Sequence, residues 1–259
     1  MDLDRRLQQL PAEIQAYSLQ VVERLQDYLR ENLVGVYLLG SAALGGFIPG
    51  QSDIDIQGIC AQPLGQKEKE QIVALLSHPA LPCPTRGCEF VLYAEETVRH
   101  PSVTTSFEVN LNSGPRMSYH VTYHPEDEPP HWFILDRAIA REYAIPIFGP
   151  AANEIFGVIP RAWSLDAILT SAHWHAENDE AGYSSILNAC RAWRFALENR
   201  WSSKDAATDW ARPRVPDSDL LQQALDLRAG KTEEKLDPVR TRHLLAFITE
   251  SITSIRENT

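Results

Sequence analysis

Two aspartates that alternate with isoleucines, in the run Ser52-Asp53-Ile54-Asp55-Ile56, constrain this chain more than any other feature. In an extended strand, side chains two residues apart point to the same face. Asp53 and Asp55 are therefore expected side by side, with the isoleucines turned into a core. Adjacent carboxylates repel each other unless they share a proton or a cation. Because Mg²⁺ prefers hard oxygen ligands and is commonly shared with substrate phosphates, the pair points to metal-dependent phosphoryl or nucleotidyl transfer.

A Gly-Ser pair stands upstream of the aspartates. Gly40 and Ser41 follow an apolar run that predicts a strand at 34–39, and a second strand is expected at 53–60. A short helix beginning at Ala42 would offer unpaired amides to a phosphate, and the Ser41 hydroxyl could donate to the same group. The alternatives are a plain turn in which Ser41 is a helix N-cap, and an edge strand that merely exposes its aspartates.

A third carboxylate opens another apolar run. Glu89 is the first residue of the apolar run Glu89-Phe90-Val91-Leu92-Tyr93. A carboxylate at the start of a buried strand is expected either to bind a cation or to accept and release a proton. If this strand lies beside the one that carries Asp53 and Asp55, Glu89 could be a third metal ligand, a general base, or both. The alternative is a solvated strand end.

The chain divides by its hydrophobic periodicity into an α/β (α+β) part with a mixed sheet, residues 1–150, and an all-helical part, residues 151–259. Residues 145–160, rich in proline and glycine, read as the connection between them. Ser202 is a plausible N-cap of a short helix that ends at Trp210, and Asp237-Pro238 is a typical start for a last helix. The predicted strands are 34–39, 53–60, 88–93 and 117–123, and the predicted helices are 12–32, 66–76, 132–143, 164–176, 183–199, 202–210 and one that follows 237.

The net charge of the chain limits the kinds of molecule that it is expected to bind. The chain of 259 residues carries 35 acidic against 24 basic side chains, a net charge of −11, which argues against a nucleic-acid groove. The excess acid is compatible with a cationic small molecule, although most acidic surfaces only favour solubility. The first twenty residues lack the apolar block of a signal peptide, and no segment is apolar for long enough to span a membrane. We expect a cytoplasmic protein, with a monomer as one option.

The helical part contains candidate phosphate ligands. Arg191 lies in an apolar helix, and Lys204 follows Ser202-Ser203 at a helix start, where such cations could neutralise a triphosphate. Two basic residues are unremarkable by themselves. The acidic residues Glu177 and Asp179 precede the next helix, where they would complement its dipole or recognise an amine-bearing substrate.

Several of these stretches together resemble one family. Leu38–Phe47 with Pro49 and Ser52–Asp55 resembles the nucleotidyltransferase signature, and in particular that of the aminoglycoside 3''-adenylyltransferases, which modify streptomycin and spectinomycin. The segments Leu187–Trp193 and Ser202–Ala207 resemble the part of the family's helical domain that contacts the ATP phosphates. The resemblance runs through roughly residues 20–215.

The resemblance implies a polymerase-β-like nucleotidyltransferase domain followed by a helical bundle. The resemblance also implies that Asp53 and Asp55 hold Mg²⁺. It implies that Glu89 deprotonates an acceptor hydroxyl, which attacks the α-phosphorus of ATP and expels pyrophosphate. Gly40, Ser41, Ser52, Arg191 and Lys204 would bind the nucleotide.

The acceptor side departs from the family pattern. Asn110 stands near the place of the family's streptomycin-contacting tryptophan, and Ser184 replaces a histidine. The family's acidic pair aligns only loosely with Glu177, Asp179 and Glu180, and one of its positions falls on Ala181. The expected function is therefore AMP transfer to an aminoglycoside-type antibiotic. The alternatives are nucleotidyl transfer to another small hydroxylated metabolite, and a non-catalytic nucleotide-binding module.

Overall fold

The computed structural model describes residues 3–178 and 182–259, and its chain forms two compact units, Met1–Ile159 and Pro160–Thr259. The two units are described separately. The sequence predicts the boundary between the α/β part and the helical part at residue 150, whereas residues 151–159 belong to the first unit. A side-chain contact illustrates this grouping, because the ring of Phe156 packs edge-on against Tyr37 at 5.2 Å between centroids.

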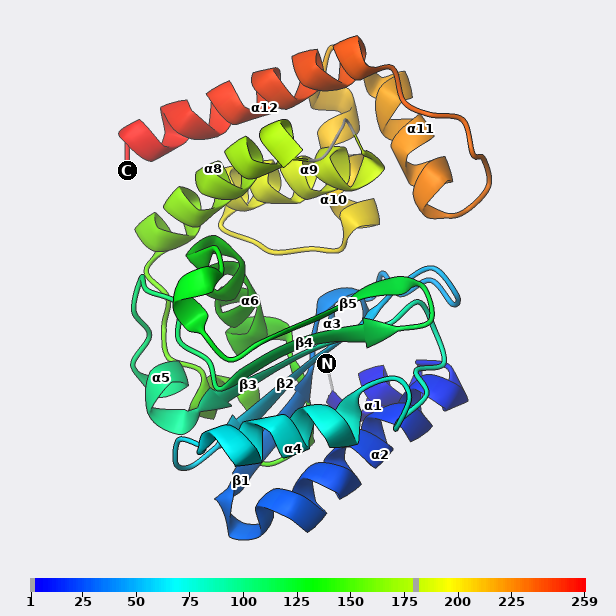
Figure 1. Ribbon diagram of the computed structural model, residues 1–259. Helices are drawn as coiled ribbons and strands as arrows, with labels where there is room; N and C mark the ends of the chain where they lie inside the picture. Colours follow the sequence, from blue (N-terminus) through cyan, green and yellow to red (C-terminus); the bar gives the residue numbers. More distant parts are fainter. Residues whose placement is uncertain (1–2, 179–181) are drawn as a thin grey trace. The chain divides into compact units, whose positions relative to one another are not determined.

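The first unit is built on a mixed six-stranded sheet with the order β5-β4-β3-β2-β1-β6 (Figure 1). Only β2 and β3 are parallel; every other neighbouring pair is antiparallel. The mixed sheet was expected, and the edge-strand alternative for the aspartates is excluded because β2 is an interior strand. The strands are β1 (Leu33–Leu38), β2 (Ile54–Cys60), β3 (Cys88–Ala94), β4 (Val109–Gly114), β5 (Met117–Thr122) and β6 (Ile145–Phe148).

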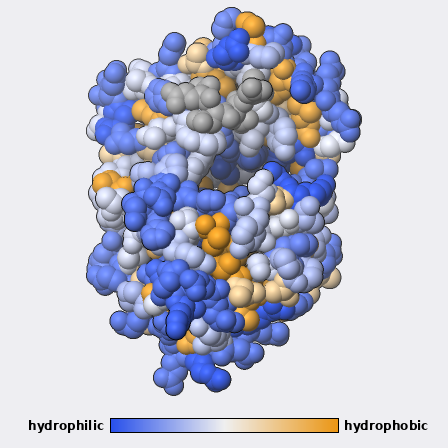
Figure 2. All heavy atoms as spheres, in the orientation of Figure 1, coloured by the Kyte–Doolittle hydropathy of each residue, from blue (hydrophilic) through white to orange (hydrophobic). Residues whose placement is uncertain are grey.

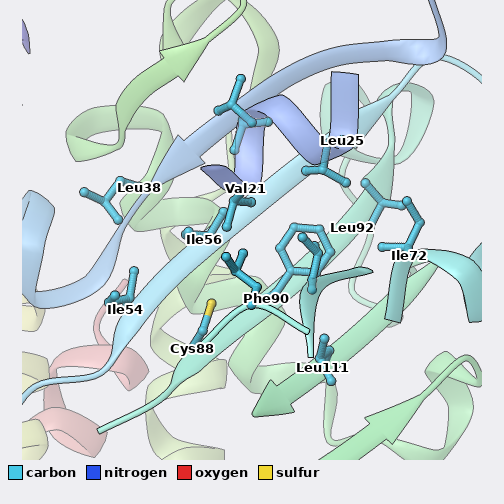
Figure 3. Close-up of a cluster of buried hydrophobic side chains, with 14 of the residues drawn as sticks. Val21, Leu25, Leu38, Ile54, Ile56, Ile72, Cys88, Phe90, Leu92 and Leu111 are labelled. Carbon is cyan, nitrogen blue, oxygen red and sulfur yellow. The ribbon is translucent and has the colours of Figure 1, made fainter. Parts of the chain in front are cut away.

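Successive side chains along each strand point to opposite faces of the sheet, and a hydrophobic layer lies on each face. On one face, Ile54 and Ile56 join Phe90, Val21 and Ile72 in a cluster beneath α2 and α4, as the close-up of Figure 3 shows. The other face packs Tyr37, Ile59 and Tyr93 against α5, α6 and α7. The prediction that the isoleucines of the Asp/Ile run lie in the core is thus confirmed. Asp55, at an odd position of β2, belongs to the second face, whereas Asp53 precedes the strand.

The helices of the first unit follow the predicted periodicity with small differences at their ends. The predicted helix 12–32 ends as an α-helix at Leu29 and continues as a 3₁₀ turn, Arg30–Asn32. The helices are α1 (Leu3–Gln8), α2 (Ala12–Leu29), α3 (Gly40–Ala43), α4 (Gln66–Leu76), α5 (Glu95–Arg99), α6 (Pro130–Tyr143) and α7 (Ala152–Ile155).

The interpretation of residues 145–160 as a connection is wrong in its first part. Ile145–Phe148 forms β6, which pairs with β1 at the sheet edge, and Ala152–Ile155 forms the short helix α7. The sequence concealed this strand because it is only four residues long and contains Pro146, which removes a ladder donor and is tolerated at an edge.

The second unit is helical, as predicted. Its longest helix, α12, packs along α8 and α9 (Figure 1). Asp237 caps α12 as expected, since its carboxylate accepts hydrogen bonds from the amides of Val239 and Arg240. The cap of α10 is Ser203 and not Ser202, because the Ser203 hydroxyl accepts from the Ala206 amide at 3.2 Å. The helices are α8 (Arg161–Asn178), α9 (Tyr183–Glu198), α10 (Lys204–Ala211), α11 (Ser218–Arg228) and α12 (Pro238–Glu257).

The visible surface of the molecule is mostly polar. Hydrophilic residues cover most of the face seen in Figure 2. Within residues 3–178 and 182–259, no helix combines the length and the apolar character that crossing a bilayer requires.

Candidate active site

Asp55 and Glu89 are neighbours on adjacent strands. The parallel pairing of β2 with β3 places their α-carbons directly opposite each other, so that both side chains lie on the second face of the sheet. Adjacent strands are about 4.8 Å apart, so two carboxylates share a small space. The strand of Glu89 therefore lies beside the strand of Asp55, which is the arrangement that a shared role of these acids requires.

Gly40 closes this site from the side of β1. Its φ is +55°, and a Cβ built at this position would lie only 1.7 Å from Oδ2 of Asp55. The Leu39 amide donates to the Asp55 carbonyl at 2.9 Å, which holds the turn against β2. Only glycine combines the left-handed conformation with so close an approach. The turn therefore sets backbone directly against the carboxylate.

Ser41 carries a buried hydroxyl that has no hydrogen-bond partner among the described residues. It is the second residue of α3, whose N-cap is Leu39, so the interpretation of Ser41 as a helix cap is wrong. An unsatisfied buried polar group costs about 1–3 kcal/mol, which favours a ligand as its partner. Since α3 is only one turn long, its dipole adds little, and the hydroxyl and the local backbone are the groups available to a phosphate.

Ser52 has a structural task in the loop that precedes β2. Its hydroxyl accepts from the Ile48 amide at 3.0 Å, and its carbonyl accepts from the Thr85 hydroxyl at 2.6 Å. These bonds close the loop and fix the start of the strand. The Ser52 hydroxyl retains one proton to donate, so its prediction as a nucleotide contact stays a prediction.

Asp53 lies just before β2 and is partly exposed. Arg86 is its ion-pair partner at 3.9 Å between Nη1 and Oδ2, a long and partly solvated contact. In the part of the chain that the structure describes, no group of three or more histidine, cysteine, aspartate or glutamate side chains is placed to hold a metal. A three-carboxylate cage is therefore absent there. Two carboxylates that share Mg²⁺ with phosphate oxygens and water fit the residues that are present.

Asn110 is on β4, a strand that the sequence analysis missed. Its side chain is buried on the second face and donates to Oε1 of Glu128 at 3.4 Å. Asn112 on the same strand lies opposite Glu89. Asparagine has a low strand propensity, which hid β4. The alternation of two asparagines with Val109, Leu111 and Ser113 was the available signal.

The predicted cations of the second unit lie on or beside one face of α9. Nζ of Lys204 donates to the Ser184 hydroxyl at 3.2 Å, and Ser184 and Arg191 are seven residues apart, which places them on the same side of the helix. Asn188, between them, and Ser202 each have a buried side-chain oxygen without a partner among the described residues. The spacing 184, 188, 191 was the signal for this polar stripe, which the sequence analysis did not use.

The two acidic acceptor candidates receive less support. Glu177 lies in the last turn of α8, not in the segment ahead of the following helix where the sequence placed it. Asp179 falls outside the described residues.

A cavity of about 1260 Å³ lies within the second unit, between α8, the start of α9 and one face of α12. His173, His175 and Tyr183 line it, together with Arg242 and Glu250. None of the residues predicted to bind nucleotide does so. The candidate chemistry is therefore not organised around this cavity.

Comparison with known proteins bears on what the site does. Residues 154–254 match the family model described as aminoglycoside adenylyltransferase, C-terminal domain. The aminoglycoside (3'') (9) adenylyltransferase of Escherichia coli is 26% identical over 238 residues, 87% of this chain and 89% of that protein. The corresponding protein of Rhizobium radiobacter is 28% identical over 243 residues, 89% of this chain and 87% of that protein. The spectinomycin 9-adenylyltransferase of Staphylococcus aureus is 24% identical over 246 residues, 91% of this chain and 94% of that protein.

A solved structure gives the same fold. The spectinomycin adenyltransferase AAD(9) from Enterococcus faecialis, determined with ATP and spectinomycin, aligns with a TM-score of 0.69 at 18% identity. The alignment covers 92% of this chain and 98% of the other. The family match in the helical unit and the relatives that are similar over nearly the whole chain support the aminoglycoside adenylyltransferase family of nucleotidyltransferases.

Proposed function

We propose that this protein transfers AMP from ATP to a hydroxyl of an aminoglycoside-type antibiotic and releases pyrophosphate. One observation carries the proposal: Asp55 and Glu89 are in register on adjacent strands, and the Gly40 turn packs against the Asp55 carboxylate. A carboxylate that handles protons beside a carboxylate suited to a metal is the pair that nucleotidyl transfer needs. The relatives named for the modification of aminoglycosides and spectinomycin support the choice of acceptor.

Each group of side chains has a distinct role in this proposal. Glu89 takes the proton of the acceptor hydroxyl, and the freed oxygen attacks the α-phosphorus while the bond to pyrophosphate breaks. Positioned carboxylate bases contribute about 10²- to 10⁴-fold to rates.

The remaining residues bind the nucleotide. The Gly40 backbone and the Ser41 hydroxyl receive a phosphate, with Ser52 nearby in sequence. Arg191 and Lys204 supply positive charge to the triphosphate from the second unit. Asp53 and Asp55 would hold Mg²⁺, which when bound neutralises charge on the phosphate oxygens and stabilises the leaving group.

The test is a screen of the purified protein against streptomycin, spectinomycin and an uncharged polyol, with Mg²⁺ and each nucleoside triphosphate in turn. Pyrophosphate release and the mass of an AMP–acceptor adduct are measured together, with and without EDTA. We expect an adduct with ATP and at least one antibiotic, and none after chelation. Adduct formation only with the polyol would indicate another metabolite, and ATP binding without any adduct would indicate a non-catalytic module.

A further inference from the structure

A row of polar side chains crosses four strands on the second face of the sheet. Asp55 on β2 is opposite Glu89 on β3, Glu89 is opposite Asn112 on β4, and Asn112 is opposite His120 on β5. Residues directly opposite each other on neighbouring strands point to the same face. The candidate general base therefore lies in the middle of a polar row that continues beyond it for two more strands.

Glu128 lies at the far end of this row. It stands in the loop before α6, and its Oε1 is 2.5 Å from Nε2 of His120 and 3.4 Å from Nδ2 of Asn110. The Glu128 side chain is only 16% exposed, whereas that of His120 is 50% exposed. A carboxylate held on one oxygen by a histidine and an amide has a fixed orientation, and its other oxygen remains an acceptor.

Gln57 gives an independent indication that this face binds a ligand. It lies two residues beyond Asp55 on β2, so its side chain belongs to the same face, and it is only 3% exposed. Its Oε1 has no hydrogen-bond partner among the described residues. A buried amide oxygen without a hydrogen-bond donor destabilises the protein, and a ligand hydroxyl or ammonium group that donates to it could remove this cost.

The spacing of the row matches a substrate with several functional groups. Glu89 on β3 and His120 on β5 are two strand spacings apart, about 10 Å at about 4.8 Å per strand. A molecule of two or three sugar-like rings spans that length. If one of its hydroxyls lies at Glu89, a positively charged group elsewhere on it reaches the carboxylate at the end of the row.

We propose that Glu128, oriented by His120 and Asn110, binds an ammonium or guanidinium group of the acceptor while Glu89 receives its hydroxyl. This inference rests on the proposed function, because it assigns the acceptor side of the same site. It gives Asn110 a role as a support for Glu128.

The experiment compares Glu128→Gln with Glu126→Gln. Glu126 is in the 3₁₀ turn Pro125–Asp127 just before Glu128 and also lies near a histidine, His124, at 3.6 Å, but its side chain is 74% exposed, which makes it a matched control. We expect Glu128→Gln to raise the acceptor KM by about 10- to 100-fold, the loss of one charged hydrogen bond, with the ATP KM within about two-fold of wild type. The control should leave both KM values unchanged.

A binding measurement separates this inference from the proposed reaction. Streptomycin and spectinomycin are titrated calorimetrically into wild type and both variants with Mg²⁺ and a non-hydrolysable ATP analogue, which requires no turnover. Weaker binding to Glu128→Gln alone supports the inference even if no AMP transfer is found. Equal binding to all three proteins, binding of neither antibiotic to wild type, or parallel losses for ATP and acceptor with a lowered melting temperature would overturn it.

Discussion

The α-carbon of Gly40 faces the carboxylate of Asp55 so closely that a methyl group at position 40 would overlap Oδ2, at 1.7 Å. The relationship joins the glycine turn after β1 to the aspartate of β2. It makes the glycine a requirement of the site itself, in addition to a requirement of the turn.

The first prediction separates these two requirements. Gly40→Ala should lower the free energy of unfolding by more than the roughly 1–2 kcal/mol expected for a left-handed alanine, and should abolish turnover because Asp55 is displaced. Gly45→Ala is the matched control, because its φ is +72° and a Cβ at that position would meet no described atom within 4 Å. Urea unfolding and ATP turnover measure both effects, and equal losses for the two variants would contradict the role of Asp55.

The second prediction concerns the metal. Asp53→Asn and Asp55→Asn should each abolish Mg²⁺-ATP turnover while the melting temperature stays near that of wild type, because an amide keeps the shape and removes the charge. Asp27→Asn, an exposed carboxylate on α2, is the control and should remain fully active. Turnover is followed by pyrophosphate release at several Mg²⁺ concentrations, and full activity of both site variants would refute the metal role.

The third prediction concerns Glu89. Glu89→Gln should bind ATP with unchanged affinity and lose transfer by about 10²- to 10⁴-fold, because the amide cannot accept the proton of the hydroxyl. Calorimetric titration with a non-hydrolysable ATP analogue and single-turnover assays separate the two steps. If nucleotide affinity falls together with transfer, Glu89 acts first as a metal ligand.

The fourth prediction tests the cations of the second unit. Arg191→Ala and Lys204→Ala should raise the ATP KM by about ten-fold or more, because each would remove a charge that we propose contacts the triphosphate. Arg194→Ala is the control on α9, since Arg194 pairs with Glu198 at 3.1 Å, and its ATP KM should stay unchanged. An equal effect of all three substitutions would indicate a general loss of stability, which circular dichroism would detect.

The fifth prediction concerns acid stability. The Arg240 guanidinium, hydrogen-bonded to Asp217 at 2.7 and 2.8 Å, lowers the pKa of that carboxyl below its usual value. A carboxyl with a depressed pKa adds stability above its unfolded pKa and loses that contribution as the pH falls through the folded one. Asp217→Asn, which preserves the α11 cap, should therefore be less stable than wild type at pH 7. The difference should begin to shrink below about pH 4 and should vanish only when the pH lies below the lowered pKa of the folded state.

Urea unfolding from pH 7 to pH 2.5 would measure this difference. Glu233→Gln, an exposed site in the loop before α12, should give no difference at any pH. A gap between Asp217→Asn and wild type that persists unchanged at low pH would show that the ion pair is not its source.

The sequence predicted the elements of this protein better than their pairing. The alternation around Ile54 and Ile56 identified β2 and its buried face, because a two-residue period is a local signal. That Glu89 lies opposite Asp55 could only be stated as a condition, since strand pairing joins residues that are far apart along the chain. The position of Gly40 against Asp55 could not be foreseen at all.

Local ambiguity explains the other differences. Ser202 and Ser203 are equally good caps by residue type, and only the backbone of α10 decides for Ser203. Asn110 and Asn112 concealed β4 because asparagine is rare in strands. Those asparagines lie on the face that carries Glu89, so the polar composition that hid the strand is explained by the proposed site.

The parallel pairing of β2 with β3 means that main-chain hydrogen bonds fix the distance between Asp55 and Glu89. Helix α4 and its flanking loops, residues 61–87, could gain or lose whole turns during evolution and leave that separation intact. A single residue inserted into β2 or β3 would instead exchange Asp55 or Glu89, respectively, with a core side chain, because neighbours along a strand face opposite ways. Length variation among descendants of this fold should therefore accumulate in that crossover and stop at the two strands that flank it.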